Sequence, residues 1–139
     1  MWKKLIKILI LPLLALAVFL WYRAPVRFLK QLDAEQVACI RIFDGNTGYE
    51  LDVTAADDIE TILSNIQSTR VRRSGISLMR MGYRYRMTFL DASGASLGQM
   101  IMNSATTLRH DPFFYEDEAG GLCYDYIWDL FDHSYGYLH

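Results

Sequence analysis

The stretch LMRMGYRYRMTFLDASGASLGQMIMN, Leu78–Asn103, decides the fold because apolar and polar side chains alternate along much of its length. From Leu78 to Leu90, methionine, tyrosine or phenylalanine occupies every second position, and arginine or threonine stands at most positions between them. A period of two is that of a β-strand, which points successive side chains to opposite faces of a sheet. The stretch therefore predicts a strand over Leu78–Leu90 with one apolar face and one arginine-rich face.

A reversal of the chain follows this strand. Ser93-Gly94 is a turn sequence, and the segment after it is again rich in apolar residues. With a two-residue turn, Met87 lies opposite Met100 and Tyr85 lies opposite Met102, which keeps the apolar face continuous across both strands. The sequence thus predicts an antiparallel hairpin.

Shorter patterns of the same kinds predict the remaining elements of the domain. Strands are expected at Val37–Asp44, Tyr49–Val53, Thr106–His110 and Phe113–Glu116, and helices at Ala55–Gln67 and Leu122–Asp132. The order is β-β-α-β-β-β-(β)-α, with short turns between successive strands. We therefore expect an α+β domain of two layers, with a mostly antiparallel sheet of five or six strands and both helices on one face.

Particular side chains are expected to be buried between these layers. The first strand has a wholly apolar side, formed by Ala38, Ile40 and Ile42, which is expected to face the core. Thr54 is the expected N-cap of the first domain helix. That helix carries an apolar stripe at helical spacing, formed by Ile59, Ile62, Leu63 and Ile66.

An apolar run precedes the domain. Leu5–Tyr22 reads LIKILILPLLALAVFLWY, eighteen residues with one charge. At ~1.5 Å per residue a helix of this length covers about 27 Å, near the lower limit for crossing the hydrocarbon core of a bilayer. Trp21 and Tyr22 end the run with rings that favour the membrane interface. We expect an uncleaved transmembrane signal anchor over residues 1–23; cleavage near Ala15-Leu16-Ala17 is the alternative, because small residues there resemble a signal-peptide cleavage site.

The rest of the chain divides into three parts. Residues 24–35 are expected to form a juxtamembrane linker or short helix, residues 36–133 the globular domain, and residues 134–139 a flexible tail. Because a short N-terminal tail with a large C-terminal domain usually stays N-in, we expect the domain to be extracytoplasmic. The chain through Glu35 has six bases and two acids (+4), and the remainder has eight arginines and fourteen acids (−6). The domain is acidic and only the segment next to the membrane is basic, which argues against nucleic acid as a partner.

Six arginines fall between the first domain helix and the middle of the long predicted strand: Arg70, Arg72, Arg73, Arg80, Arg84 and Arg86. One interpretation is the solvated face of a sheet, since alternating charge is typical of an exposed strand face. The other is a surface that binds anions, because guanidinium groups form forked hydrogen bonds with phosphate and carboxylate groups. Anionic lipid, an anionic wall polymer or a membrane protein would suit such a surface. The solvated face is the preferred interpretation.

Motifs for catalysis, cofactors or metals are not recognisable in the sequence, so we expect a protein that is not an enzyme and holds no metal. Cys39 and Cys123 fit no zinc spacing, and in an oxidising compartment they could form a disulfide. His110 and His133 each adjoin an aspartate, which leaves a hydrolase as an alternative. The tyrosines near the C-terminus, such as Tyr135, predict either a partner-binding patch or a frayed tail.

The layout MWKKLIKILILPLLALAVFLWYRAP, followed by the pattern of strands and helices, resembles that of small single-span α+β proteins anchored to the membrane of Gram-positive bacteria. The resemblance covers the whole chain and concerns layout alone, so no functional residue carries over. The sequence predicts a membrane-anchored, non-enzymatic domain that binds or senses a partner at the outer membrane surface. The alternative is a structural or regulatory subunit that acts through its span inside a larger membrane complex.

Overall fold

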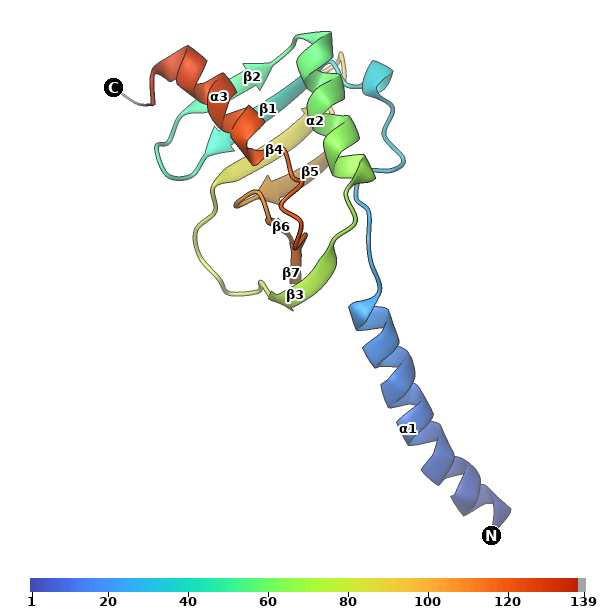
Figure 1. The fold of residues 1–139 in the computed structure, drawn as a ribbon. Helices are drawn as coiled ribbons and strands as arrows, with labels where there is room; N and C mark the ends of the chain where they lie inside the picture. The colour runs from blue at the N-terminus through green and yellow to red at the C-terminus, as the bar shows by residue number, and fades with distance from the viewer. Residues whose placement is uncertain (138–139) are drawn as a thin grey trace.

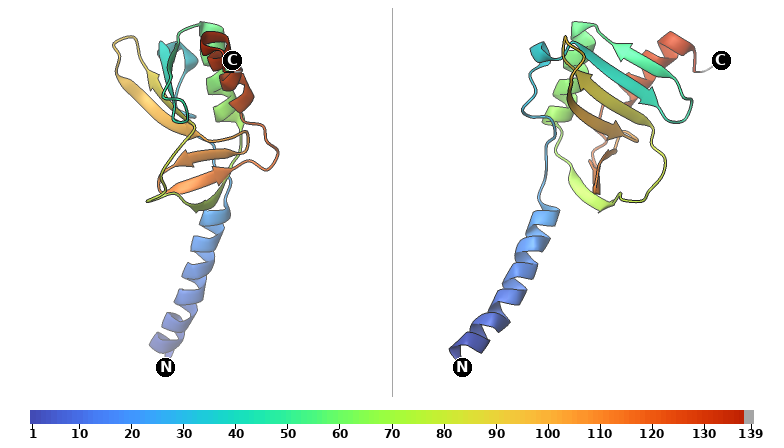
Figure 2. Two further views of the ribbon diagram at one scale, coloured as in Figure 1. Left: turned by 90° about the vertical axis from the view of Figure 1, so that its left-hand side faces the viewer. Right: turned by 180° about the vertical axis from the view of Figure 1, so that it is seen from behind.

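The computed structural model describes residues 1–137, which form an N-terminal helix and an α+β domain (Figure 1). Helix α1 (Trp2–Arg23) projects away from the domain, and α2 (Ala56–Ser68) and α3 (Tyr124–Tyr135) lie on the same face of one antiparallel sheet (Figure 2). The sheet contains β1 (Cys39–Asp44), β2 (Glu50–Val53), β3 (Arg72–Ile76), β4 (Tyr85–Leu90), β5 (Ser96–Met102), β6 (Thr107–His110) and β7 (Phe113–Glu116). Its strand order is β2-β1-β4-β5-β6-β7-β3.

The predicted hairpin lies in the middle of this sheet, and its register is confirmed from Tyr85 to Phe89. The predicted two-residue turn is wrong, because the register shifts between Phe89 and Leu90 and the N–H of Asp91 donates to the carbonyl of Ala95. β4 and β5 pair with Tyr85 opposite Met102 and Met87 opposite Met100. All four side chains are buried, at most 1% exposed, and they belong to the apolar face of the sheet on which the two helices pack. The continuous apolar face predicted from the alternation is therefore the centre of the core.

The first half of the long predicted strand, residues 78–84, is instead a loop. The two neighbours of β4, strands β1 and β5, both end level with Tyr85. Arg84 still accepts a hydrogen bond from the backbone N–H of Gly45, but the residues before it have no neighbouring strand to pair with. Met79 and Met81, which the alternation assigns to the buried face, are 98% and 97% exposed. Alternation makes a strand only where a neighbouring chain can satisfy the backbone N–H and C=O groups.

The sheet has seven strands, whereas the sequence predicted five or six. The additional strand is β3, whose sequence RRSGI contains Ser74-Gly75, a pair more typical of a turn than of a strand. It pairs with β7 at the edge of the sheet, and its register shifts between Arg73 and Gly75 as at a β-bulge. Because no residue of β3 is buried, its strand character has no apolar signal in the sequence.

The apolar surfaces predicted for the first strand and the first domain helix are nearly as expected. Ile40 and Ile42 are fully buried, but Ala38 is exposed because it precedes β1. The N-cap of α2 is Ala55, so the predicted cap at Thr54 is wrong by one residue, and no side chain caps this end. The predicted stripe of α2 is buried: Ile59, Ile62, Leu63 and Ile66.

Helix α3 begins and ends later than predicted, and the residues after it pack on the domain. Ile127 and Phe131 are its buried residues. Gly136 ends the helix in the left-handed conformation that glycine adopts readily. The ring of Tyr137 stacks on Phe131 at 5.6 Å between centroids. Residues 138–139 of the expected tail lie outside the described residues.

The linker between α1 and the sheet is attached to the domain, and Leu29 within it takes a positive φ of 60°. Val26 forms an isolated β-bridge with Val71, and Leu29 and Leu32 are buried in the core. The amide of Gln67 on α2 donates hydrogen bonds to the carbonyl oxygens of Leu29 and Leu32 at 2.8 and 2.6 Å. These contacts fix the position at which the chain enters the domain.

Helix α1 is long and apolar enough to cross a membrane, by length and composition. Its 22 residues correspond to about 33 Å, and none of its side chains is buried. Only its C-terminal end touches the domain, where Trp21 and Tyr22 pack edge-on against Phe113 of β7 at 6.1 and 5.7 Å between centroids. β7 and the edge strand β3 therefore form the foot of the domain.

Candidate functional site

The six arginines predicted as a candidate surface are divided by the fold into separate places. Arg70, Arg72 and Arg73 lie at the start of β3, beside the end of α1. The other three, Arg80, Arg84 and Arg86, lie on the following loop and on β4. In the sheet order, β5, β6 and β7 lie between β4 and β3, so the two groups occupy different parts of the domain.

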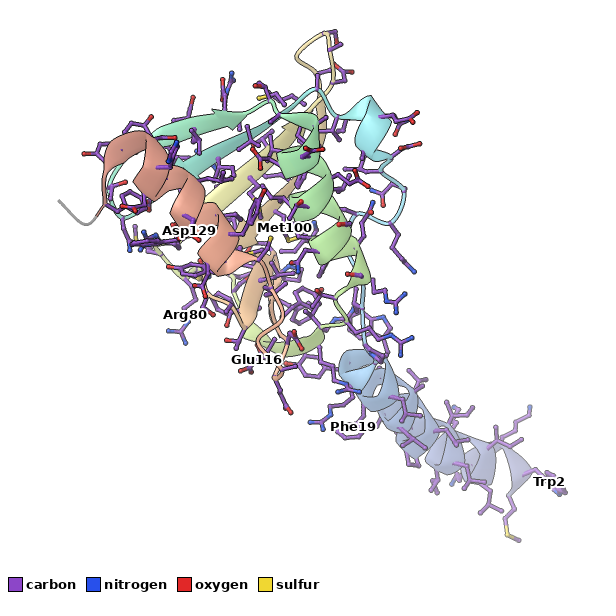
Figure 3. All side chains as sticks on the ribbon, turned by 45° about the horizontal axis from the view of Figure 1, so that its top comes forward. Trp2, Phe19, Arg80, Met100, Glu116 and Asp129 are labelled. Carbon is purple, nitrogen blue, oxygen red and sulfur yellow. The ribbon has the colours of Figure 1, made fainter. Side chains whose placement is uncertain are left out.

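The first group lines a cavity of ≈ 630 Å³ between the end of α1, β3 and the segment after β7. Its lining contains Tyr22, Arg23, Pro25, Arg70, Arg72, Arg73, Ser74, Glu116, Asp117, Glu118 and Ala119. Four guanidinium groups and three carboxylates thus face one space, with one positive charge in excess. In Figure 3, Glu116 and Phe19 mark the domain side and the helix side of this region.

Arg70 and Arg72 are exposed, and their charges are not compensated within the described residues. Neither has a carboxylate oxygen within 4.0 Å, although Arg72 stands opposite Glu116 in the β3–β7 ladder. The carboxylate of Asp117 instead accepts hydrogen bonds from the backbone N–H groups of Ala119 and Gly121. These two arginines are therefore free to bind an anion that enters the cavity.

Arg73 has a structural position in the same lining. Its guanidinium carbon lies 3.9 Å from the ring centroid of Trp21 and within 5.6 Å of those of Phe113 and Tyr115. Nη1 donates a hydrogen bond to the carbonyl oxygen of Trp21 at 3.0 Å, and Nε is buried with no hydrogen-bond partner. Cation–π contacts of this kind hold a charge without neutralising it, so Arg73 attaches the end of α1 to β3.

Arg84 is paired with a buried acid at the junction between the end of β1 and the start of β4. Its Nε lies 3.1 Å from Oδ1 of Asp44, whose side chain is fully buried. The same carboxylate accepts hydrogen bonds from the backbone N–H of Asn46, the hydroxyl of Thr47 and the hydroxyl of Tyr137. Burial raises the pKa of Asp44, but these hydrogen bonds and Arg84 outweigh it, and the pKa lies below its usual value.

The remaining two arginines lie in different surroundings, and Arg86 lines a cavity of ≈ 450 Å³ together with Arg109 and Asp111. Arg86 lies over the rings of Phe43 and Tyr83, at 5.4 and 5.1 Å from their centroids. The side chain of Arg80 is exposed, while its carbonyl oxygen accepts a hydrogen bond from Arg109 at 3.0 Å. Arg80 is exposed and Arg86 is half-buried, and the interpretation of these positions as a solvated face stays a prediction.

The two cysteines are free and lie in different surroundings. Cys39 is on β1 near Arg41 and Asp52, and burial followed by Asp52 raises the pKa of its thiol. Cys123 lies at the start of α3, where burial raises its pKa to about 12. A thiol with such a pKa is almost entirely protonated at neutral pH and unreactive.

The histidines of the hydrolase alternative are both exposed on the surface. His110 stacks on Phe28 at 5.4 Å between centroids, and His133 lies in the last turn of α3. Among the described residues, no group of three or more His, Cys, Asp or Glu side chains could hold a metal ion.

The sequence analysis identified Arg70, Arg72 and Arg73 but not the rest of this lining. Arg23, Pro25 and residues 116–119 reach the cavity only because β3 pairs with β7 and α1 ends beside both. Comparisons of the chain with protein-family models, with curated proteins and with solved structures found no match.

Proposed function

We propose that this chain is a single-span membrane protein whose extracytoplasmic domain binds an anionic group in the cavity beside the end of its span. The observation that carries the proposal is the meeting of Arg23, Arg70 and Arg72 in one cavity directly after the apolar helix. If α1 crosses the bilayer, Trp21 lies at the interface, and the cavity lies at the level of the lipid headgroups. The phosphate groups of the lipids are then the anions closest to the cavity.

The chemistry of the lining supports a phosphate with a neighbouring polar group. Guanidinium groups bind phosphate oxygens through forked, charge-assisted hydrogen bonds, and Arg70 and Arg72 have no competing carboxylate within 4.0 Å. The carboxylates of Glu116 and Glu118 in the same lining suit a hydroxyl or an amine attached to that phosphate. A phospholipid headgroup combines these features, whereas a free phosphate ion has only the first.

The test uses the full chain purified from membranes, with bound phospholipid counted by native mass spectrometry. We expect the double variant Arg70→Gln/Arg72→Gln to lose lipid that the wild type retains. Arg86→Gln is the matched control, because Arg86 is also on the sheet but lies away from the cavity. Added phosphatidylglycerol, phosphatidylethanolamine and inorganic phosphate then distinguish a headgroup from a free anion. Equal lipid retention by the double variant and the wild type contradicts the proposal.

One contact favours a second candidate function, a regulatory subunit that acts through its span. The stack of Arg73 on Trp21, with the hydrogen bond to the Trp21 carbonyl, joins the domain to the end of α1 without a flexible hinge. A rigid joint of this kind would transmit a movement of the domain to the helix. Crosslinking in native membranes tests it: partners that disappear when the apolar run is replaced by an unrelated span favour the subunit.

A further inference from the structure

A second feature of the foot is an apolar loop that no part of the domain covers. Four large apolar side chains point into solvent between the end of β3 and residue 81: Ile76, Leu78, Met79 and Met81. The two methionines are almost fully exposed, at 98% and 97%. Single exposed apolar residues are common, but four within six residues form a patch of the kind that marks a contact surface.

The base of this loop is firmly held, so its side chains are presented by an ordered backbone. The buried Ser77 donates a hydrogen bond from its N–H to the carbonyl of Pro112 at 2.8 Å and from its hydroxyl to Asp111 at 2.5 Å. Arg109 donates to the carbonyl oxygens of Ser77 and Arg80 at 3.2 and 3.0 Å. Met79 takes a φ of 65°, which turns its side chain outward at a position where a β-strand would bury it.

The position of the loop relative to α1 indicates what covers it. β3 begins beside Trp21, where Arg73 is stacked, and the loop continues directly from its far end. In both views of Figure 2, β3 and the start of the loop lie level with the C-terminal end of α1, at the part of the domain nearest to that helix. A bilayer crossed by α1 therefore has its surface next to this loop.

We propose that the loop from Ile76 to Met81 is a second membrane contact, which inserts its apolar side chains into the outer interface of the bilayer that α1 crosses. This inference rests on the proposed membrane anchoring of α1 and is independent of what binds in the cavity. Interfacial segments bury apolar side chains about 5–10 Å into the boundary between headgroups and acyl chains. Arg80, in the middle of the loop, fits this depth because its long stem reaches back to the phosphates.

Insertion at this point would also orient the domain. The Arg73–Trp21 joint fixes the domain to α1, but a single span still leaves the helix and the domain free to tilt together in the bilayer. Two contacts, one at Trp21 and one at Met79, place the edge of β3 along the membrane surface. The cavity lined by Arg70 and Arg72 lies between these two contacts in sequence and would be held against the headgroups.

The test measures the depth of a fluorescent label in the full chain reconstituted into lipid nanodiscs. Single cysteines are introduced in a Cys39→Ser/Cys123→Ala background and labelled with an environment-sensitive dye at Met79→Cys. Val18→Cys reports on the span, and Ala92→Cys, in the exposed turn after β4 at the end of the domain away from α1, is the aqueous control (Figure 1). Quenching is measured with spin-labelled lipid and with aqueous iodide.

We expect lipid quenching and blue-shifted emission at positions 18 and 79, and iodide quenching alone at position 92. Iodide quenching at position 79 as strong as at position 92, with lipid quenching retained at position 18, overturns this inference and leaves the anchor intact. Absence of lipid quenching at position 18 overturns the anchoring of α1 instead. Blue-shifted emission at position 79 without lipid quenching also overturns the inference, since it would indicate a protein partner.

A second variant shows whether the apolar side chains themselves cause insertion. The label is placed at Arg80→Cys, once in the native loop and once with Leu78→Ser, Met79→Ser and Met81→Ser. The two methionines are almost fully exposed and Leu78 is 56% exposed, so the fold loses little packing. Lipid quenching at position 80 should fall to the level seen at position 92 in the serine loop. Unchanged quenching there contradicts insertion driven by this patch.

Discussion

Two regions of the domain, the junction between the end of β1 and the start of β4 and the foot, each hold an arginine among aromatic rings, and they differ in what balances the charge. At the junction of β1 and β4, Arg84 lies over Tyr85 and is paired with the buried carboxylate of Asp44. At the foot, Arg73 lies over Trp21, and its partners among residues 1–137 are aromatic rings and a carbonyl oxygen. A compensated charge stabilises a fold by itself, whereas an uncompensated one leaves positive potential for something outside the fold. The difference separates the structural region of the domain from the region that we propose contacts lipid.

Removing the compensated arginine should have the largest effect on stability. Arg84→Ala leaves Asp44 buried without its cation, and breaking a buried ion pair in this way costs about 3 kcal/mol of unfolding free energy. Urea unfolding of the full chain in detergent micelles, followed by circular dichroism, measures the loss. Arg41→Ala is the matched control, because its ion pair with Asp52 is about half exposed and is worth at most about 1 kcal/mol. Equal losses in the two variants would refute the structural role of the Arg84 pair.

Acid should weaken the junction of β1 and β4 as well, by a smaller amount. The folded pKa of Asp44 lies below its usual value of 3.8, so its carboxylate stabilises the fold at pH values above the unfolded pKa. That contribution is lost as the pH falls through the folded pKa. In urea titrations at decreasing pH, the wild type should lose stability below about pH 4 more steeply than Asp44→Asn, which has no group to titrate at this position. Parallel profiles would show that the acid sensitivity arises elsewhere.

The uncompensated arginine should contribute less to unfolding and more to the joint with α1. Arg73→Ala removes cation–π contacts worth about 1 kcal/mol, and it releases the Trp21 carbonyl. Spin labels at position 18 and position 92 should show a broader distance distribution in this variant than in the wild type. Arg73→Lys retains the charge but not the planar stack, so it should be intermediate. A distribution as narrow as that of the wild type in Arg73→Ala would mean that Phe113 and the linker hold the joint alone.

The same comparison shows how much could be predicted from the sequence. The centre of the sheet was predictable because its evidence is local: apolar alternation, a Ser93-Gly94 turn and a register that follows from the two. The foot was not, because β3 has no buried residue and becomes a strand only by pairing with β7, some forty positions away in the chain. The alternation of residues 78–84 gave a wrong prediction of a strand, because the strand pattern is present there but no neighbouring strand is.

The candidate site followed the same division. Arg70, Arg72 and Arg73 stand out in the sequence as a cluster of charge, but whether such a cluster is solvated or enclosed depends on which segments surround it. The cavity needs residues 23–25, 70–74 and 116–119 together, and no local pattern relates those three segments. Arg84 belongs to the same run of arginines in the sequence and has the opposite role, because Asp44 reaches it from β1.

The smallest effect on stability is expected where the side chains are most exposed. Substitutions there test the difference between the foot and the junction of β1 and β4. Replacing both Met79 and Met81 by serine removes apolar surface that is already in water in the isolated domain. Surface substitutions of this kind change the unfolding free energy by at most about 0.5 kcal/mol. In detergent, urea unfolding of the double variant should therefore match the wild type. In nanodiscs the two should diverge, because only the wild-type loop gains free energy from lipid. A loss of stability in detergent as large as that of Arg84→Ala would show that the loop packs on the domain. The foot would then have a structural role, like the junction of β1 and β4.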